Sequence, residues 1–191
     1  KILNNMALIA LEDNNADLCT MCNGCYGSLL EVDHVLKHDA KLKNKVNEDL
    51  KLINRKFKGS ITVKHIVEIL YLDIGIENLK KMIKKKLDLR VGVHYGCHIL
   101  KPTAIRPWGC EFEAPRFLDE LVEITGAKSI EYKDKMMCCG AGGGVRSAIK
   151  EVALDYTQEK LTNMRDQNVD IIITSCPFCH LQLDLGQVEI N

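Results

Sequence analysis

The stretch DIIITSCPFCHLQL, residues 170–183, decides the fold of this chain. It begins with an unbroken apolar run, continues into a Cys-x-x-Cys element at Cys176 and Cys179, and ends in the apolar spacing of a helix start. A short run that is apolar on both faces is typical of a central strand in a parallel sheet that helices cover on both sides. The sequence therefore predicts such a strand at 170–175, with the cysteines at its carboxyl end.

A second stretch, ADLCTMCNGCYGSL at residues 16–29, repeats this order 154 residues earlier. It places Cys22 on Cys176 and Cys25 on Cys179, again between a strand-like run and a helix start. Self-similarity of this kind is the signature of a repeated structural unit.

Further strand-like runs, VGVHYG at 91–96 and SIEY at 129–132, alternate with helical segments, which is typical of an α/β fold. We predict two pseudo-repeated units, at 1–89 and 90–191, with short, mostly parallel sheets flanked by helices. In the superposition of the two units Cys19 falls on a strand position, which assigns its thiol to the core.

Apolar spacing and turn residues also predict the positions of the helices. After the turn at Gly59, Ser60 is expected to be the N-cap of a helix that carries the apolar residues from Ile61 to Leu70. The other predicted helices span 6–13, most of 28–58, 76–87, 115–125 and 146–167.

The composition bounds the class of protein. The chain has 191 residues, 26 basic and 26 acidic side chains and 46% hydrophobic residues, which excludes intrinsic disorder. No run approaches the roughly 18–20 apolar residues that cross a bilayer, and the first residues do not resemble a signal peptide. We therefore expect a soluble, cytoplasmic protein without a transmembrane segment, and its zero net charge argues against a nucleic-acid partner. Two basic stretches, 41–58 and 78–90, are predicted to be solvent-exposed helix faces, with a docking surface for an anionic partner as the alternative.

Nine cysteines in a chain without a secretion signal indicate metal or redox chemistry rather than disulfides. In the second unit each cysteine of one group follows a predicted strand or lies in a glycine-rich turn: Cys97, Cys138, Cys139, Cys176 and Cys179. Ligands of an open parallel sheet gather beyond the carboxyl ends of its strands, so these thiols are expected to converge. One tetrahedral zinc needs only four ligands, whereas iron–sulfur clusters depend on thiolates, so the count favours a multinuclear iron centre.

The adjacent cysteines belong to the run MCCGAGGGVR, residues 137–146. Its glycines allow positive φ angles and let backbone N–H groups approach sulfur, where hydrogen bonds raise a reduction potential: Gly140, Gly142, Gly143 and Gly144. An anion-binding loop or a flexible turn is the alternative for this run. A vicinal disulfide would strain the peptide that links the pair. The element at Cys22 and Cys25, taken alone, also fits a redox dithiol or half of a zinc site.

This order of cysteines resembles the family of the cysteine-rich CCG domain. Here a leading cysteine is followed by 40 residues, a Cys-Cys pair, 36 residues and a Cys-x-x-Cys element, the first interval being slightly longer than is usual in that family. The runs MCCGAGGGVRS and SCPFCHLQLDLGQVEIN are most similar to the B subunit of the CoB–CoM heterodisulfide reductases of methanogenic archaea. That family carries two CCG units, and the missing cysteines of the first would precede Lys1. The resemblance implies an N-terminally truncated first unit in 1–89 and a complete second unit in 90–191.

The resemblance further implies an oxidoreductase subunit that reduces the CoM-S-S-CoB disulfide to CoM-SH and CoB-SH at non-cubane [4Fe-4S] clusters, two in the full protein. One cluster would be held by Cys97, Cys138, Cys139, Cys176 and Cys179, whereas Cys22 and Cys25 would be ligands of the other. The implied partners are the iron–sulfur C subunit and the flavin-containing A subunit of a heterodisulfide reductase. Because both coenzymes carry anionic groups, three cations are candidate substrate-binding residues, with ordinary surface positions as the alternative: Lys101, Arg106 and Arg146.

Three histidines lie beside the cysteines in the sequence: His94, His98 and His180. Each is a candidate donor of a hydrogen bond to sulfur, with a solvent-facing or helix-end position as the alternative. Cys110 and Trp108 have no place in the motif and are assigned to packing. Two other functions remain open: an electron-transfer protein of a fumarate reductase or of a lactate or glycolate oxidising complex, and a zinc-stabilised binding module. Visible absorbance that dithionite bleaches would exclude zinc.

Overall fold

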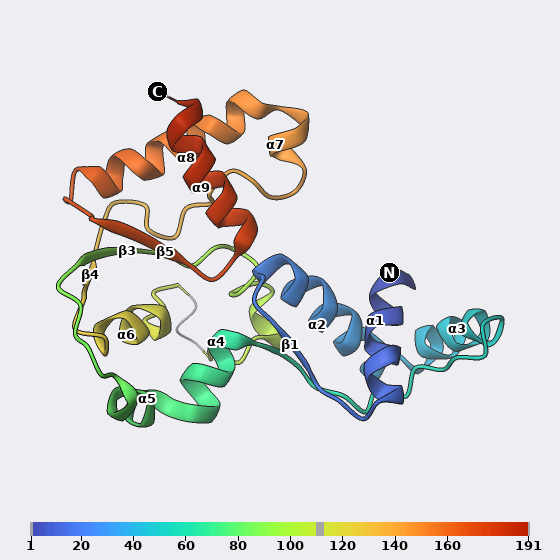
Figure 1. Ribbon diagram of the computed structural model, residues 1–191. Coiled ribbons are helices and arrows are strands. Elements are labelled where there is room, and N and C mark those ends of the chain that lie inside the picture. Colours follow the sequence, from blue (N-terminus) through green and yellow to red (C-terminus); the bar gives the residue numbers. More distant parts are fainter. Residues whose placement is uncertain (1, 110–112, 191) are drawn as a thin grey trace.

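The computed structural model describes residues 2–109 and 113–190, which form short parallel sheets flanked by helices (Figure 1). One sheet has the strand order β1-β2 and the other the order β4-β3-β5, and each neighbouring pair is parallel. The predicted α/β fold class is confirmed. No helix in this part of the chain has both the length and the apolar character needed to cross a bilayer.

The first sheet and its helices contain α1 (Ile2–Asp13), β1 (Leu18–Thr20), α2 (Asn23–His38), α3 (Ala40–Lys51) and β2 (Val63–His65). Asp39 starts α3 by accepting a hydrogen bond from the Leu42 N–H, as an N-cap side chain does. The core of this part is a continuous apolar cluster: Leu8, Ile9, Tyr26, Leu36, Leu50, Phe57, Ile61 and Val63.

The rest of the chain builds the second sheet. Its elements are α4 (Ile66–Glu68), a π-helix (Ile69–Gly75), α5 (Ile76–Met82), β3 (Arg90–His94), a 3-10 turn (Thr103–Ile105), α6 (Phe117–Glu123), β4 (Lys128–Ile130), α7 (Val145–Ala148), α8 (Lys150–Arg165), β5 (Ile171–Thr174) and α9 (Pro177–Glu189). Figure 1 shows α6 on one face of this sheet and α8 and α9 on the other.

The central strand β3 explains how these layers pack. Val91 and Val93 are buried in one cluster with Phe117 of α6. Gly92 faces the opposite layer, where an added Cβ would lie 3.4 Å from the sulfur of Met164 on α8. Alternate residues of a strand point to opposite faces, so β3 contacts the helix layer of α6 with one face and that of α8 with the other.

The prediction of a helix starting at Ser60 is wrong. The chain is extended up to His65, and β2 pairs with β1 in the register Leu18↔Val63. The helix begins only at Ile66, with His65 as its N-cap. The β-branched run from Ile61 to Val63 favours a strand, and β1 offers the backbone partners that the sequence spacing does not reveal.

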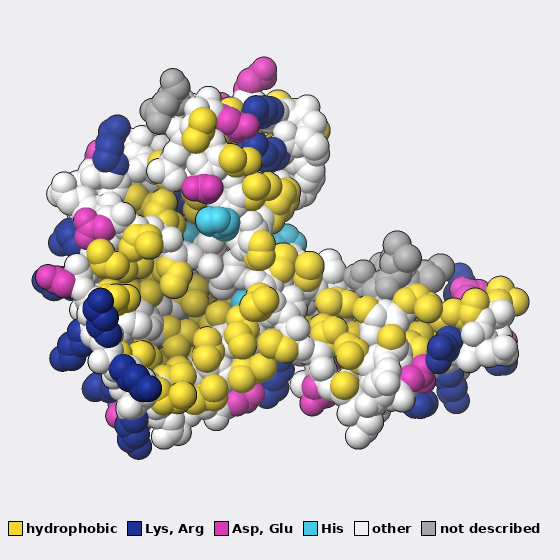
Figure 2. All heavy atoms as spheres, viewed as in Figure 1, with side chains coloured by type: hydrophobic (Ala, Val, Ile, Leu, Met, Phe, Trp, Pro, Cys, Tyr) yellow, Lys and Arg dark blue, Asp and Glu magenta, His cyan; other side chains and the backbone are white. Residues whose placement is uncertain are grey.

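The strand at 170–175 is present, but it is not central. β5 pairs with β3 and with no other strand among the described residues, so β3 holds the central place. Ile171 and Ile173 are 51% and 43% exposed. Figure 2 shows further apolar side chains gathered on the face over α4, α5 and α6. An apolar run indicates a strand, but it does not say how many neighbours the strand has.

Two predicted helices differ in length from the observed ones. The helix at 76–87 ends at Met82, because Lys84 and Lys85 would lie one helical turn from the like charges of Lys80 and Lys81. The helix at 146–167 is broken at Ile149, which has φ −141° and ψ 77°. Arg146 on α7 donates hydrogen bonds to Gln182 and Glu189, which tie α7 to α9.

Cys19 does not belong to the core, as predicted from the superposition, because its side chain is exposed. It lies on β1 opposite Lys64. The residue pairs on either side of it between β1 and β2 include Val63 and His65, whose side chains are buried. Since side chains alternate along a strand, the pair at Cys19 and Lys64 faces outward.

Glu12 joins the end of α1 to the loop that precedes β2. Its buried carboxylate accepts hydrogen bonds from the backbone N–H groups of Lys58 and Ser60, both at 2.8 Å, and from that of Gly59. We expect Glu12→Gln to lower the free energy of unfolding by about 2 kcal/mol, because the amide turns one acceptor into a donor that faces N–H groups. Urea denaturation would measure it.

The matched control is Glu48→Gln, which removes an exposed carboxylate that pairs with Lys51 on α3. An exposed ion pair of this kind contributes at most about 1 kcal/mol. Equal denaturation midpoints for the two variants would contradict the assigned role of Glu12.

Candidate metal centre

The cysteines of the second unit lie at the carboxyl ends of parallel strands or in the loop that follows one. Cys97 comes shortly after β3, and Cys176 follows β5 as the N-cap of α9. Cys179 belongs to the first turn of α9, and Cys138 and Cys139 lie between β4 and α7. Because β4, β3 and β5 are parallel, their carboxyl ends meet at one edge of the sheet.

The sulfur atoms lie close together. Cys139 Sγ is 3.4 Å from Cys179 Sγ, and Cys22 Sγ is 4.0 Å from Cys176 Sγ. The thiols of Cys139, Cys176 and Cys179 are buried, whereas Cys97 and Cys138 are exposed. The group therefore has a buried side and an open side.

The thiols also act on one another's protonation. A hydrogen bond with Cys139, and then one with Cys97, lowers the pKa of the Cys138 thiol to about 2. A hydrogen bond with Cys179 lowers the pKa of Cys176 to about 4. The same contacts raise the pKa values of Cys97, Cys139 and Cys179. Thiolates, the form that binds metal, are thus favoured at Cys138 and Cys176 at neutral pH.

The glycine-rich loop takes the conformation that its glycines allow. Gly140, Gly143 and Gly144 have positive φ angles. The N–H of Gly140 donates a hydrogen bond of 3.3 Å to Cys138 Sγ. A backbone donor to sulfur is therefore present here without any contribution from a charged side chain.

A chain of hydrogen bonds holds the Cys-Cys loop against α8 and α9. Thr157 Oγ1 donates to the Cys139 carbonyl at 3.0 Å, and Gln182 Nε2 donates to Thr157 Oγ1 at 2.6 Å. Arg146 donates in turn to Gln182 Oε1 at 2.8 Å. Thr157 and Gln182 are fully buried. These residues were not identified from the sequence, although Thr157 and Lys160 occupy the buried stripe of α8 between Ala153 and Met164.

Lys160 is a buried cation beside the thiols. Its side chain is fully buried, and Nζ donates to the carbonyls of Asp134 and Lys135 at 3.1 Å each. Burial lowers its pKa to about 8, while Cys139 and Cys138 counter this. In the described part of the chain Lys160 forms no ion pair with a carboxylate, so the site thiols are its principal source of negative charge.

His94 completes the buried side of the group. One of its ring nitrogens and the Sγ atoms of Cys139 and Cys179 all lie within 4.8 Å of one another. The ring is fully buried, and neither nitrogen has a hydrogen-bond partner among the described residues. Burial lowers the pKa of His94 to about 3, which keeps the ring neutral.

The first Cys-x-x-Cys element touches the second. Cys22 and Cys176 are N-caps with nearly the same backbone angles, φ −127° and ψ 121° against φ −131° and ψ 115°. Next to Cys22, Asn23 donates to the Tyr95 carbonyl at 2.8 Å and accepts from the Ser175 hydroxyl at 3.0 Å. Cys25, in the first turn of α2, is exposed.

The candidate substrate-binding cations differ in their contacts. Lys101 is exposed beside a hollow of about 580 Å³ that Cys97 and His98 also line. Arg106 is buried, where it donates to the carbonyls of His98 and Lys101 and lies 4.9 Å from the ring of Tyr26. Arg106 and Arg146 thus donate hydrogen bonds to groups of the protein itself, whereas Lys101 faces a hollow.

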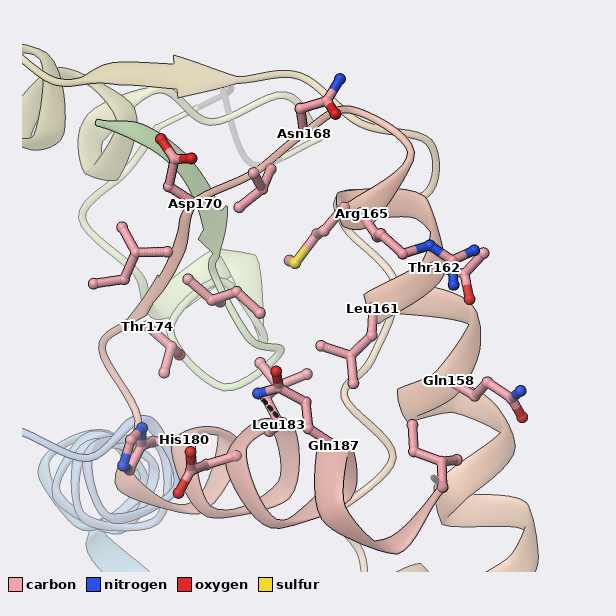
Figure 3. A pocket seen from close by; sticks show the side chains of 16 residues that line it. Gln158, Leu161, Thr162, Arg165, Asn168, Asp170, Thr174, His180, Leu183 and Gln187 are labelled. Atoms are coloured by element: carbon pink, nitrogen blue, oxygen red, sulfur yellow. Dashed lines mark hydrogen bonds between the residues drawn. The ribbon is translucent and has the colours of Figure 1, made fainter. Parts of the chain in front are cut away.

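His98 Nδ1 lies 3.2 Å from Cys97 Sγ, as expected of a candidate partner of sulfur, whereas the other candidates lie apart from the thiols. His180 is exposed and lines a hollow of about 860 Å³ between β5, α8 and α9, in which no cysteine takes part (Figure 3). Trp108 stacks on Phe117 with 3.8 Å between the two ring centroids, which confirms its assignment to packing. Cys110 lies outside the described residues.

The residues present suit an iron–sulfur group. The donors are thiols, more of them lie together than one tetrahedral zinc takes, and a fully buried histidine beside them lacks a partner for its ring nitrogens. The assignment of each cysteine as a ligand stays a prediction.

Comparison with known proteins agrees with this chemistry. Residues 91–184 match the family model of the cysteine-rich CCG domain. A relative from Methanosarcina acetivorans, the B subunit of a ferredoxin/F(420)H(2)-dependent CoB-CoM heterodisulfide reductase, is 50% identical over 96% of the chain and 61% of its own length. A protein of Archaeoglobus profundus that is named as similar to the heterodisulfide reductase B subunit is 38% identical. That match covers 94% of the chain and 61% of the relative's own length. The B subunit of a fumarate reductase (CoM/CoB) of Methanothermobacter marburgensis is 34% identical. That match covers 65% of the chain and 26% of the relative's own length. The chain thus spans about 61% of the length of the two heterodisulfide reductase relatives.

Proposed function

Because the chain belongs to the family of the cysteine-rich CCG domain, we propose that it binds an iron–sulfur cluster at the thiols of its second unit. The ligands are Cys97, Cys138, Cys139, Cys176 and Cys179, and the cluster is of the non-cubane [4Fe-4S] type. Cys22 and Cys25 belong to a second cluster. The observation that carries this proposal is the gathering of thiols, three of them buried, at the carboxyl ends of β3 and β5.

The reaction that this site supports best is reduction of the CoM-S-S-CoB disulfide to two thiols. A relative that is 50% identical is named as a heterodisulfide reductase B subunit and one that is 38% identical as a B-like protein, which supports this substrate and a place in a multisubunit complex. The partners that we propose in that complex are the C and A subunits. An iron–sulfur centre supplies one-electron transfer to and from sulfur when it is bound.

The side chains around the site have separate tasks in this reaction. The buried thiols Cys139, Cys176 and Cys179 close the inner side against water. Cys97 lies on the open side, where the hollow beside it gives a sulfur-containing substrate access. Lys101, at the same hollow, provides a cation for an anionic group of the coenzymes.

A second candidate function is electron transfer within a fumarate reductase. The 34% identity to the B subunit of a fumarate reductase supports it, although that match covers only 65% of the chain. In this alternative the same thiols hold the cluster, but no disulfide reaches the hollow beside Cys97.

Anaerobic reconstitution of the 191-residue chain with iron and sulfide tests the proposal. We expect a coloured protein with several iron and sulfide per chain, whose visible absorbance dithionite bleaches. Oxidation in the presence of CoM-SH is then expected to produce a paramagnetic signal that is absent without the thiol.

The outcomes separate the candidate functions. A colourless chain that binds one zinc tightly would support the binding module and overturn the proposal. A bleachable chromophore without any thiol-dependent signal would favour electron transfer to another acceptor.

A further inference from the structure

Each sheet carries a buried histidine at the same place relative to its Cys-x-x-Cys element. In the second sheet His94 pairs with Thr174, and Cys176 follows two residues after that threonine. In the first sheet His65 pairs with Thr20, which precedes Cys22 by the same interval. Both histidines are fully buried. Their position is set by strand register, which the spacing of the cysteine motif does not show.

The surroundings of His94 leave sulfur as the partner for its ring. One ring nitrogen and the Sγ atoms of Cys139 and Cys179 all lie within 4.8 Å of one another. Neither ring nitrogen has a hydrogen-bond partner among the described residues. A buried polar group without a hydrogen-bond partner is costly, so native proteins supply one. A neutral imidazole carries one N–H donor, and the Sγ atoms of Cys139 and Cys179 are acceptors close to a ring nitrogen.

We propose that His94 donates its N–H to a sulfur of the iron–sulfur centre, either the thiolate of Cys139 or Cys179 or an inorganic sulfide beside them. His94 is thus a positioning residue that stabilises the more electron-rich, reduced state. Such hydrogen bonds to sulfur raise the reduction potential of a cluster. This inference rests on the proposed iron–sulfur function.

His65 repeats the arrangement where the two Cys-x-x-Cys elements meet. Its Nδ1 accepts a hydrogen bond from the Val67 N–H at 3.2 Å, so the ring proton lies on Nε2. The buried Nε2 has no hydrogen-bond partner among the described residues. The thiol of Cys176 lies 4.0 Å from that of Cys22. A second buried N–H donor therefore has the same register relative to Cys22 as His94 has relative to Cys176.

The test compares three variants of the reconstituted chain by redox titration. We expect His94→Leu to shift the reduction equilibrium at least tenfold toward the oxidised state, which is about 59 mV for one electron. His94→Gln keeps an N–H donor and is expected to recover part of the shift. His180→Leu is the matched control, because His180 follows Cys179 but is exposed at the other hollow, and we expect it to keep the wild-type potential.

A second measurement covers the case in which the leucine variant binds no iron. In wild-type protein with ¹⁵N-labelled histidine, pulsed EPR of the reduced centre is expected to show a weak nitrogen coupling that His94→Gln removes. A strong coupling, as from nitrogen bound directly to iron, or no coupling at all would overturn the inference.

The possible failures are distinguishable. If wild-type chain forms the chromophore but His94→Leu keeps its potential, the assignment of His94 is wrong and the proposed function stands. If wild-type chain forms no coloured centre, the proposed function falls, and the assignment of His94 with it.

Discussion

Cys179→Ser is expected to abolish iron binding by the reconstituted chain. The Cys179 thiol is buried, lies 3.4 Å from Cys139 Sγ and adjoins Cys176. A serine hydroxyl is a poor substitute for a soft thiolate, and at this position it leaves a gap in the inner wall of the site. Since loss of an outer-shell partner alone weakens metal binding about 10- to 100-fold, we expect a larger loss here. Iron and sulfide analysis with the visible spectrum measures it.

The matched control is Cys19→Ser. Cys19 is also a cysteine next to a Cys-x-x-Cys element, but its side chain is exposed on β1. We expect this variant to bind as much iron as the wild type. Equal iron content in the Cys179 and Cys19 variants would contradict the ligand assignment.

Gly140→Ala is expected to unfold the Cys-Cys loop. Gly140 has φ +94°, and a Cβ there would lie 2.3 Å from the Ala153 carbonyl oxygen of α8. Neither the backbone angle nor the helix carbonyl can adjust at low cost, so we expect a loss of about 3 kcal/mol in the free energy of unfolding. The N–H of Gly140 also donates to Cys138 Sγ, so cluster formation is expected to fail together with the loop. Thermal denaturation and iron content report the two effects separately.

Gly142→Ala provides the comparison within the same loop. An added Cβ at Gly142 meets no atom within 4 Å, and its φ is not positive. We expect stability and iron content close to the wild type. If both alanine variants behave alike, the loop does not need the conformation that the structure gives it.

Local patterns predicted the parts of the fold that depend on local residues. The apolar runs at β3 and β5 and the strand before Cys22 were found because each combines β-forming residues with a turn or cysteine at its end. The gathering of thiols followed from one rule about parallel strands. These features need no knowledge of which elements are neighbours.

The predictions that were wrong are those that depend on which elements pair or pack together in the fold. The place of β5 at the edge depends on pairing with β3, and the strand at Val63 depends on β1, which lies more than 40 residues earlier. The exposed position of Cys19 follows from the same pairing. His94 was noted as a neighbour of Cys97 in sequence, but its burial and its unpartnered nitrogens arise from the packing of β3 between two helix layers. Lys160 was missed because a lysine in an amphipathic helix is usually solvated.

The buried ammonium of Lys160 links metal loading to folding as a single equilibrium. A cation buried without a carboxylate costs stability, and here the negative charge that offsets the cost comes from thiolates. When the metal is removed, the Cys139 thiol, whose pKa its neighbours raise, takes up a proton, and the ammonium loses part of that compensation while its carbonyl partners at Asp134 and Lys135 stay in place. The emptied chain is therefore the less stable form. Under the proposed function, iron and sulfide stabilise the fold in addition to supplying the redox chemistry.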